Sequence, residues 1–377
     1  MRRPRFHLFC RVVDNYGDAG VCWRLARALA AEHALDVSLL IDDVATLARI
    51  EPAIDARAVG QNVAGLTVAR LEEAAPPRSL PDVVIEAFGC GLPAAYVGAM
   101  AAATMKPRWI NLEYLSAEPW VDDAHALPSP HPRLPLVRHF WFPGFTRRTG
   151  GLLRERDLFG RRDAWRARHA PDDDALRILL FTYDNAALSA LLAHWAKGSA
   201  RIRCGVPHGV AAASLERGLG VRLPPPGGSV DCGNVELRML RFTDQDQFDT
   251  KLWHADVNFV RGEDSFVRAQ WAARPFVWNV YPTDDGAHWV KMSAFLARYT
   301  QGLDRAHAGA VTALWEAWNR PAEAVEGQPA RPAVSEAWPA FAARLGALES
   351  HARQWSDRLG TQRSLAEQLV DFVDNVL

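Results

Sequence analysis

Short apolar runs alternate with amphipathic stretches along most of the chain. In the first half, strands are predicted for the runs FHLFCRVV, DVSLLI, LTVARL, DVVIEAF and RWINLE. A helix is predicted for GVCWRLARALAAEH, which follows the first of these runs. The run PDVVIEAF shows no polar alternation, and this is typical of a strand that is buried on both faces. Strands that alternate with helices predict a mainly parallel sheet covered by helices.

A second series of strands follows an Arg-rich stretch at 147–174. Its members are LRILLFTY, RIRCGVP, VELRML, ADVNFV and PFVWNVY. The Pro/Gly-rich segment GVRLPPPGGSVDCGN is predicted to be a loop within this half. We therefore expect an N-terminal Rossmann-like domain at 1–160 and a C-terminal Rossmann-like domain at 161–360.

The last part of the chain has a helical pattern. It begins near Ala287 and is interrupted by a Pro-containing stretch at 322–335. The amphipathic run SLAEQLVDFVDNVL predicts a C-terminal helix within 361–377 that packs back on the first domain. Two α/β halves with a helical tail match the GT-B glycosyltransferase fold, in which two Rossmann-like domains face a cleft. This is an analogy of fold, and fold alone does not assign chemistry.

Composition narrows the class of protein. The chain has 377 residues, of which 49% are hydrophobic and 23% charged, and its formal net charge is −1. Nucleic-acid binding selects strongly basic faces, so this balance argues against a nucleic-acid partner. The five cysteines are scattered and form no CxxC pair, which favours a reducing cytoplasm over a disulfide framework or a structural zinc site. The longest small-apolar run, AAYVGAMAAATM, is shorter than the roughly 20 residues that span a bilayer.

The segment VVDNYGDAG places two acids between the first predicted strand and the first predicted helix. Gly17 and Gly20 permit tight backbone geometry there. In a purely structural interpretation, Asp18 caps the helix and Asp14 forms an Asx turn. In a functional interpretation, both carboxylates face the cleft, where they could accept a proton or hold a cationic acceptor group. The glycine fingerprints of dinucleotide and P-loop sites are absent from the sequence.

The segment RGEDSFVRAQW indicates a binding site more specifically than VVDNYGDAG does. It follows the predicted strand ADVNFV, and its helix is expected to begin near Glu263–Ser265. Gly262 lets the backbone approach a ligand, the first N–H groups of the helix attract an anion, and Arg261 adds a permanent positive charge. The alternative is an ordinary capped helix with acids in its first turn. Both segments lie at carboxyl ends of strands, where ligands of open α/β sheets collect.

Two further segments could bind a nucleobase. FTYDN ends the first strand of the second half, and FTDQDQFD precedes the helix before ADVNFV. Phe181 and Phe248 could stack on a base and Gln245 could read its edge, although both aromatic residues could equally belong to the core. Asp244 and Asp246 form a D-x-D, which fits a helix start better than a metal site. The histidines show no metal-ligand spacing, and no metal is expected.

Four segments of the chain resemble one known family. They are VDNYGDAGVCWRLARAL, LFTYDN, LWHADVNFVRGEDSFVRAQW and WNVYP. They look like the corresponding segments, in the same order, of the protein-arginine rhamnosyltransferases that modify bacterial elongation factor P. The resemblance runs over essentially the whole chain. It implies a GT-B fold and the transfer of rhamnose from TDP-β-L-rhamnose, with inversion, onto one arginine of elongation factor P.

The resemblance also implies roles for individual residues. Asp18 would be the general base, while Asp14 and Glu263 would orient the acceptor guanidinium. The residues implied in donor binding are Gly17, Phe181, Tyr183, Gln245, Phe248, Arg261, Asp264 and Ser265. No cofactor or metal is required by this arrangement. The acceptor would dock mainly on the N-terminal half, where residues 113–135 are a candidate surface because they are rich in Pro, acids and aromatics.

Two other functions are compatible with these residues. A GT-B enzyme with a lipid, glycan or small-molecule acceptor would show no dependence on elongation factor P. The sequence shows no basic amphipathic patch near its N-terminus, which argues against a lipid acceptor and a membrane partner. A noncatalytic sensor of nucleotide sugars would keep its output when Asp18 is replaced by Asn. A dehydrogenase is disfavoured because its glycine fingerprint is missing.

Overall fold

The chain forms two compact units in a computed structural model. One unit comprises Met1–Leu158 together with Gly360–Leu377, and the other comprises Phe159–Leu359. The structure describes residues 3–14, 16–71, 79–207, 212–220, 222–320 and 332–374. Most of the Pro-containing stretch at 322–335 and the last three residues of the predicted C-terminal helix lie outside the described residues.

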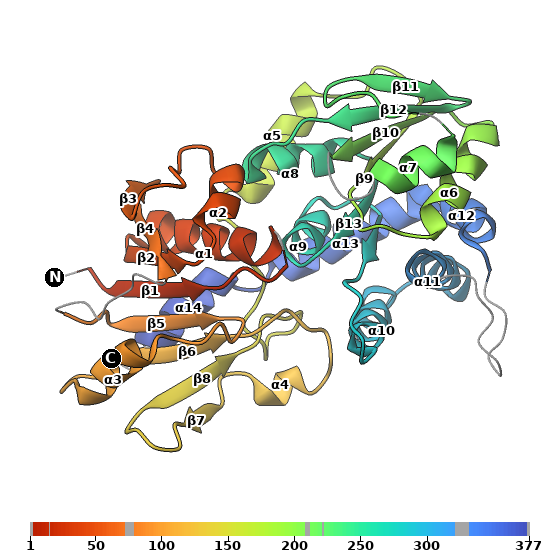
Figure 1. The fold of residues 1–377 in the computed structure, drawn as a ribbon. Helices are drawn as coiled ribbons and strands as arrows, with labels where there is room; N and C mark the ends of the chain where they lie inside the picture. The colour runs from red at the N-terminus through yellow and green to blue at the C-terminus, as the bar shows by residue number, and fades with distance from the viewer. Residues whose placement is uncertain are drawn as a thin grey trace. The chain divides into compact units, whose positions relative to one another are not determined.

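The first unit is built on an eight-stranded sheet with the order β3-β4-β2-β1-β5-β6-β8-β7 (Figure 1). Its elements are β1 (Arg5–Cys10), α1 (Gly17–His33), β2 (Asp36–Ile41), α2 (Val44–Ile50), β3 (Gly60–Val63), β4 (Leu66–Arg70), β5 (Val83–Ala87), α3 (Ala94–Ala102), β6 (Arg108–Leu112), α4 (Val121–Ala124), β7 (Pro128–Pro130), β8 (Val137–Trp141) and α14 (Leu365–Asp374). All neighbouring strands run parallel except the two edge pairs, β3 with β4 and β7 with β8. This confirms the mainly parallel sheet that the sequence predicts.

Both faces of this sheet are buried, as the continuous apolar strands predict. Successive side chains of β1 point to opposite faces. Leu8 and Cys10 belong to the larger apolar cluster, to which α1, α2 and α14 contribute. Phe9 belongs to a second cluster that contains Tyr96 and Met100 of α3. The C-terminal helix α14 therefore completes the core of the first unit, although it is separated from the rest of that unit by the whole second unit in sequence.

The second unit is built on a six-stranded sheet with the order β11-β12-β10-β9-β13-β14. Its elements are α5 (Leu158–Arg168), β9 (Leu176–Leu180), α6 (Ala187–Lys197), β10 (Ile202–Pro207), α7 (Ala212–Leu219), β11 (Ser229–Cys232), β12 (Val235–Leu240), α8 (Gln245–His254), β13 (Val257–Arg261), α9 (Asp264–Trp271), β14 (Phe276–Asn279), α10 (Ala287–Tyr299), α11 (Arg305–Asn319), α12 (Val334–Ala342) and α13 (Leu345–Gly360). Only β11 runs antiparallel to its neighbour.

The sequence patterns missed the strands at and near the sheet edges. The predicted loop GVRLPPPGGSVDCGN contains the edge strand β11, and residues 113–135 contain both α4 and the edge strand β7. Edge strands are short and half exposed, so they lack the apolar period that identifies a central strand. Two of the three residues of β7 are prolines, which sheets tolerate at their edges.

The chain has 14 tryptophans, and several of them fill the core of the second unit. Trp195, Trp315 and Trp318 are all buried. The ring of Phe259 in β13 lies 4.7 Å from that of Trp318, and Trp195 meets Trp338 of α12 at 5.0 Å. Large rigid rings bury much apolar area for little conformational entropy, so they hold α6, α11 and α12 firmly on the sheet.

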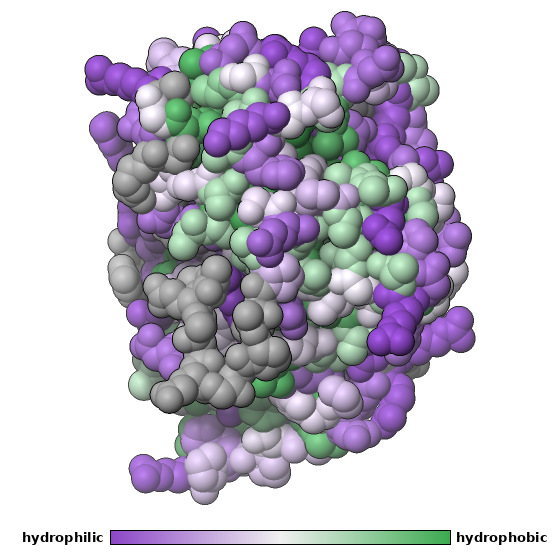
Figure 2. Space-filling view, turned by 90° about the vertical axis from the view of Figure 1, so that its right-hand side faces the viewer, coloured by the Kyte–Doolittle hydropathy of each residue, from purple (hydrophilic) through white to green (hydrophobic). Residues whose placement is uncertain are grey.

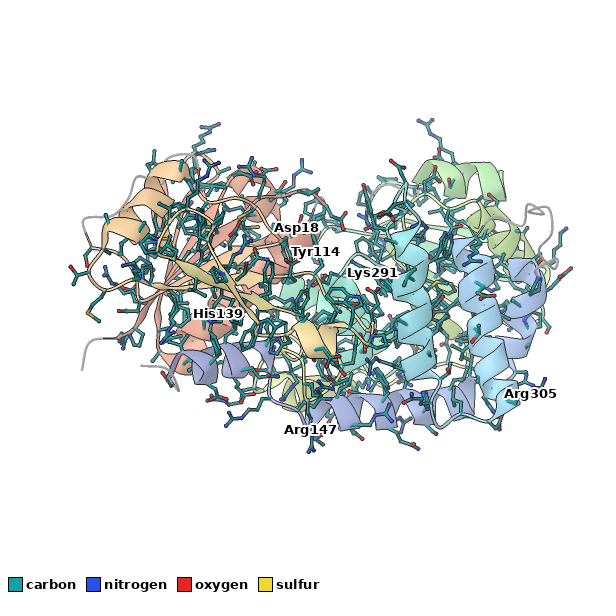
Figure 3. All side chains as sticks on the ribbon, turned by 90° about the horizontal axis from the view of Figure 1, so that it is seen from below. Asp18, Tyr114, His139, Arg147, Lys291 and Arg305 are labelled. Carbon is teal, nitrogen blue, oxygen red and sulfur yellow. The ribbon has the colours of Figure 1, made fainter. Side chains whose placement is uncertain are left out.

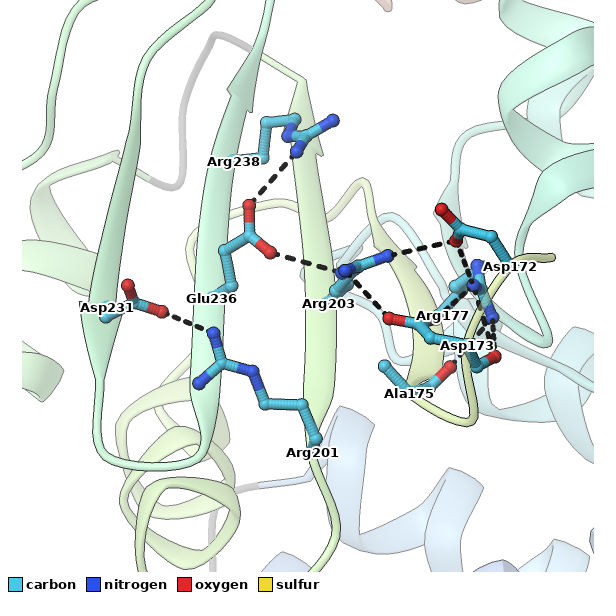
Figure 4. Close-up of polar contacts among 9 residues, drawn as sticks. All are labelled: Asp172, Asp173, Ala175, Arg177, Arg201, Arg203, Asp231, Glu236 and Arg238. Atoms are coloured by element: carbon cyan, nitrogen blue, oxygen red, sulfur yellow. Dashed lines mark hydrogen bonds and ion pairs between the residues drawn. The ribbon is translucent and has the colours of Figure 1, made fainter.

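Charged side chains join the amino-terminal ends of three strands in this sheet (Figure 4). Arg203 of β10 lies 2.7 Å from Asp173 and 3.3 Å from Glu236 of β12, while Arg177 of β9 also pairs with Asp173. Arg203 stands in register with both Arg177 and Glu236. This end of the sheet is therefore occupied by a structural ion network, and the opposite end, where strands finish, is the one available for a ligand.

The exposed surface is mixed in polarity. In Figure 2, which shows the side on which α11 and α12 lie in Figure 1, pale and green residues are interspersed with purple ones. Among the helices of the described ranges, none has the length and apolarity needed to cross a bilayer.

A buried ion pair fixes α9 against α8. Arg268 donates from Nε to Oδ1 of Asp249 at 3.0 Å and from Nη2 to Oδ2 at 2.5 Å, and both side chains are 1% exposed. The two parallel hydrogen bonds set the orientation of one helix relative to the other. This pair therefore fixes how the two helices pack on each other.

The substitution Asp249→Ala is expected to lower the free energy of unfolding by about 3–5 kcal/mol, because it leaves the Arg268 guanidinium buried without that carboxylate. The control is Arg238→Ala, which removes a side chain that is 61% exposed and pairs with Glu236. For the control we expect a loss of about 0–1 kcal/mol. Urea unfolding followed by circular dichroism measures both, and equal losses would contradict the importance of the buried pair.

Candidate active site

The buried carboxylate of Asp18 organises the turn between β1 and α1. Asp18 is 2% exposed, and its Oδ2 accepts hydrogen bonds from the backbone N–H groups of Val13 at 2.8 Å and Asp14 at 2.9 Å. The N-cap residue of α1 is Tyr16, and Asp18 lies within the first turn of the helix. The interpretation of Asp18 as the N-cap is therefore wrong. Its carboxylate instead binds the strand-to-helix turn that precedes it.

Gly17 lies against Asp14. Its N–H donates to the carbonyl oxygen of Asp14 at 2.6 Å, and a Cβ atom at this position would be 3.0 Å from Oδ2 of Asp14. A side chain at residue 17 would press on that carboxylate. Gly17, which the resemblance places among the donor-binding residues, thus serves within this structure to make room for Asp14.

Tyr114 brings a third polar group to this turn. Its hydroxyl donates to Oδ1 of Asp18 at 3.3 Å, and the two labelled side chains lie next to each other in Figure 3. The Tyr114 ring stacks on Phe88, with centroids 4.4 Å apart and planes inclined by 12°. Phe88 follows β5 and has a positive φ of 56°, an uncommon conformation for a large side chain. The ends of β1, β5 and β6 therefore converge on Asp18.

Sequence reasoning included Tyr114 only within a candidate docking stretch and gave it no role at the acid pair. Its position directly after the predicted strand RWINLE was a usable signal, because the carboxyl ends of parallel strands meet at one edge of the sheet. Phe88 is the last residue of the predicted strand DVVIEAF. Neither residue belongs to a motif, and only the tertiary structure shows that Tyr114 contacts Asp18 and that Phe88 stacks on Tyr114.

The thiols near this turn are poorly suited to nucleophilic chemistry. Burial raises the pKa of Cys22 well above its ordinary value, and a hydrogen bond with Cys10 adds to this effect. Burial also raises the pKa of Cys90, to about 12. The thiolate is the reactive form of cysteine, and thiols with raised pKa values stay protonated near neutral pH. The carboxylates of Asp14 and Asp18 are therefore better candidates for acid–base chemistry at this edge than the thiols are.

In the second unit, Arg261 meets two aromatic rings. The guanidinium carbon lies 4.7 Å from the ring centre of Phe181 and 4.6 Å from that of Tyr183. Phe181 in turn contacts Phe248 edge to face at 5.3 Å. Arg261 is 8% exposed, and its Nε has no hydrogen-bond partner among the described residues. Arg261 ends β13 and the two aromatic residues follow β9, so neighbouring parallel strands bring them together.

The helix predicted in RGEDSFVRAQW is confirmed as α9, which begins at Asp264 with Glu263 as its N-cap residue. Gly262 has a φ of 63° and makes the sharp turn from the strand into the helix. The hydroxyl of Ser265 donates to the carbonyl oxygen of Arg261. The first N–H groups of α9 thus lie beside Arg261, which gives this corner of the second unit an anion-binding character.

Gln245 and Phe248 belong to the first turns of α8, and not to a loop before the helix. The side chain of Gln245 donates from Nε2 to Oδ2 of Asp264 at 3.1 Å, so α8 and α9 are joined at their starts. Asp244 caps α8 by accepting from the N–H of Gln247 at 2.7 Å, and Asp246 lies 3.4 Å from Arg161. The D-x-D is therefore a helix start, as the sequence favoured.

The predicted residues form two groups, one in each unit. The group in the first unit consists of the acid pair Asp14 and Asp18 together with Tyr114. The second group contains all the other predicted residues except Gly17, namely Phe181, Tyr183, Gln245, Phe248, Arg261, Glu263, Asp264 and Ser265. The first group offers carboxylates, and the second offers an arginine, helix N–H groups and aromatic rings. Such a pair suits an acceptor that loses a proton and a donor that carries a diphosphate.

The fold and the two groups define a glycosyltransferase of the GT-B class. Solved structures of the spinosyn forosaminyltransferase SpnP and of MurG from Acinetobacter baumannii each match with a TM-score of 0.50. Their identities are 14% and 13%, and the matches cover 99% or more of both chains. The chain itself belongs to the family described as Elongation-Factor P (EF-P) rhamnosyltransferase EarP, whose pattern it matches over residues 6–374.

Individual relatives agree with this assignment. A protein-arginine rhamnosyltransferase from Pseudomonas putida is 44% identical over all of both chains. One from Neisseria meningitidis is 34% identical over 99% of this chain and 98% of the relative. A solved structure from work on EarP-mediated arginine glycosylation of translation elongation factor EF-P is 34% identical over the full length of both chains, with a TM-score of 0.68. The resemblance and the GT-B fold inferred from the sequence are thus confirmed.

The substitution Tyr114→Phe tests the role of the hydroxyl at Asp18 while leaving the ring stacked on Phe88. We expect the rate of transfer to fall about ten-fold, which corresponds to the loss of roughly 1.5 kcal/mol from a hydrogen bond to a charged group. An unchanged transfer rate would show that the Tyr114 hydroxyl does not act on Asp18.

Proposed function

We propose that this enzyme transfers L-rhamnose from TDP-β-L-rhamnose to an arginine side chain of elongation factor P, with inversion at the anomeric carbon. The acceptor is suggested by the description of the family and by the relative whose structure concerns EF-P. The donor follows from the resemblance together with the anion-binding corner at Arg261. We place the reaction in the cytoplasm, because all five cysteines are free and a reducing compartment keeps them so.

The observation that carries the proposal is the oriented carboxylate of Asp18. Two backbone N–H groups bind Oδ2, which leaves Oδ1, next to the Tyr114 hydroxyl, as the oxygen to receive a proton. An arginine guanidinium stays protonated at neutral pH and is a poor nucleophile in that form. A fixed carboxylate at the attacking nitrogen can take the proton as the new bond forms.

The proposed transfer forms one bond, breaks one bond and moves one proton. One guanidinium nitrogen forms a bond to C1 of rhamnose while the bond from C1 to the phosphate oxygen breaks. TDP leaves with that electron pair, and one proton passes from the attacking nitrogen to Oδ1 of Asp18. The product guanidinium keeps its positive charge. Carboxylates are weak bases for this step, so much of the driving force comes from the oxocarbenium character that develops on the sugar.

The remaining predicted residues divide between acceptor and donor. Asp14 and Glu263 would orient the guanidinium by charge-assisted hydrogen bonds. Arg261 and the first N–H groups of α9 would stabilise the charge on the departing diphosphate, without need of a metal ion. Thymine would be held by the aromatic rings at 181, 183 and 248 and by the amide of Gln245. Catalysis therefore requires the donor bound by the second unit to reach Asp18 of the first.

The substitution Asp18→Asn should abolish transfer and leave donor affinity nearly unchanged, because an amide cannot accept the proton although it keeps a similar shape. Elongation factor P is incubated with the protein and TDP-rhamnose, and intact-mass spectrometry follows the addition of one deoxyhexose to an arginine. Asp42→Asn is a matched control, since Asp42 accepts from Val12 in the same unit but has no proposed catalytic role.

Three outcomes separate the alternatives. Addition to arginine by the unmodified protein and the control, with none by Asp18→Asn, supports both the reaction and the base. If TDP-rhamnose binds but no deoxyhexose is added, the protein is still a glycosyltransferase, and its acceptor is a molecule other than elongation factor P. Addition by Asp18→Asn at the normal rate would contradict the role of this carboxylate.

The substitution Arg261→Ala should raise the dissociation constant for TDP by about ten-fold or more, since a charge-assisted contact to phosphate is worth at least 1.4 kcal/mol or so. Isothermal titration calorimetry with TDP measures this effect. Arg238→Ala, an exposed arginine of β12 in the same unit, is the control and should bind TDP normally. Equal affinities of the unmodified protein, the Arg261→Ala variant and the control for TDP would contradict the role of Arg261 in donor binding.

A further inference from the structure

We infer that Asn279 and Asn319 form a hydrogen-bond relay that positions Tyr183, and through it Arg261, for donor binding. Asn279 lies in the segment WNVYP, where sequence reasoning assigned it no role, and Asn319 belongs to none of the segments discussed above. Asn279 ends β14 and is 7% exposed, while Asn319 is the last residue of α11. The inference rests on the proposed role of the cluster of Phe181, Tyr183 and Arg261 as the donor site.

The first step of the relay joins Asn279 to the segment after β9. Its Oδ1 accepts from the backbone N–H of Tyr183 at 3.1 Å and from the hydroxyl of Thr182 at 2.6 Å. A backbone N–H can only donate, so the atom that faces Tyr183 must be the amide oxygen. This fixes the orientation of the Asn279 amide and leaves its Nδ2 as a donor on the other side.

The second step joins Asn279 to α11. Its Nδ2 donates to Oδ1 of Asn319 at 3.2 Å, and the same oxygen accepts from the N–H of Val280 at 2.9 Å. The Nδ2 of Asn319 donates to the carbonyl oxygens of Trp278 at 2.8 Å and Trp315 at 2.9 Å. Carbonyl groups can only accept, so all four hydrogen-bonding positions of the Asn319 amide are used in one consistent orientation.

The end of α11 is therefore connected to two strand ends at once. The loop after β9 also contacts the end of α11 directly, because Asn185 donates to the carbonyl oxygen of Trp318 at 2.7 Å. Trp315 and Trp318 are both buried in the core, so α11 provides a rigid base for these contacts. Apart from the contact between Asn319 and Trp315 within α11, the partners are 39 to 133 residues apart in sequence, and no local segment could hold Tyr183 in this way.

The relay sets the place of the Tyr183 ring. That ring lies 4.6 Å from the guanidinium carbon of Arg261 and meets the half-exposed ring of Tyr281 at 5.5 Å. A binding group must be held within a fraction of an ångström, and satisfied buried amides are rigid supports for this purpose. Asn319 acts on this cluster only through Asn279 and the backbone, so it is a positioning residue.

The test is a double-mutant cycle on TDP affinity with Asn279→Ala, Asn319→Ala and the double variant. We expect each single substitution to raise the dissociation constant for TDP by about ten-fold, since small displacements of binding groups are costly. The double variant should bind no more than slightly worse than Asn279→Ala, because the two residues act in series and their effects do not add. Calorimetric titration gives the affinities, and thermal unfolding gives the stability of each protein.

Asn234→Ala is the matched control. Asn234 is a half-buried asparagine of the same unit that lies beside β12, and its side chain donates to the carbonyl oxygen of Gly198. The substitution Asn234→Ala should lower the unfolding temperature and leave TDP affinity unchanged. If Asn319→Ala does not fold, Thr182→Val removes a single hydrogen bond of the relay and should still weaken TDP binding about three-fold.

The outcomes separate the relay from the proposed function. Binding of TDP by the unmodified protein and the control, with weakened and non-additive binding by the relay variants, supports the inference. Lower stability with unchanged TDP affinity would overturn it, because the asparagines would then serve folding alone. Failure of the unmodified protein to bind TDP would instead overturn the proposed donor site, and the relay would lose its function with it.

Discussion

Parallel pairing of buried strands is the constraint on which both units depend. In the first unit it brings the ends of β1, β5 and β6 to one edge of the sheet, where Asp18, Phe88 and Tyr114 meet. In the second unit it does the same for β9, β13 and β14. Because every parallel strand ends at the same edge, polar residues placed just after buried strands are collected without any need for nearness in sequence.

The two edges have opposite chemical characters. The first contains a carboxylate whose orientation is set by backbone N–H groups, and the thiols near it are held neutral by burial. The second contains an arginine against two aromatic rings and the start of a helix. A glycosyl transfer to a guanidinium needs a proton acceptor on one side and stabilisation of a diphosphate on the other. The distribution of charge between the units matches this division.

Support for the second edge comes from residues far from it in sequence. The ion pair of Asp249 and Arg268 sets α9 against α8, and the amide of Gln245 joins the starts of the same two helices. On the other side, Asn279 and Asn319 connect the segment of Tyr183 to the end of α11. All of these side chains are buried except Asn319, which is half-buried, and their hydrogen bonds are mutually consistent, so the cluster around Arg261 is supported from both flanks.

The sequence by itself determined the central strands, the start of α9 and the family. The strand at Asp36–Ile41 begins and ends as predicted, because a continuous apolar run bounded by polar residues admits few other registers. The segment RGEDSFVRAQW predicted that Arg261 ends a strand and that a helix begins just after it. This was possible because the geometry of a Gly turn into a capped helix is local. Edge strands such as β7 and β11 were missed because half-exposed pairing leaves no apolar period.

Only the tertiary structure decided what these residues contact. Asp18 looked like a helix cap, but its carboxylate binds the preceding turn and meets a tyrosine 96 positions away. Asn319 gave no signal at all, because an asparagine at a helix end is ordinary until its partners are known. Such contacts depend on strand order and on the packing of α11, which are properties of the whole fold. Local patterns therefore specified the elements, and long-range packing specified the site.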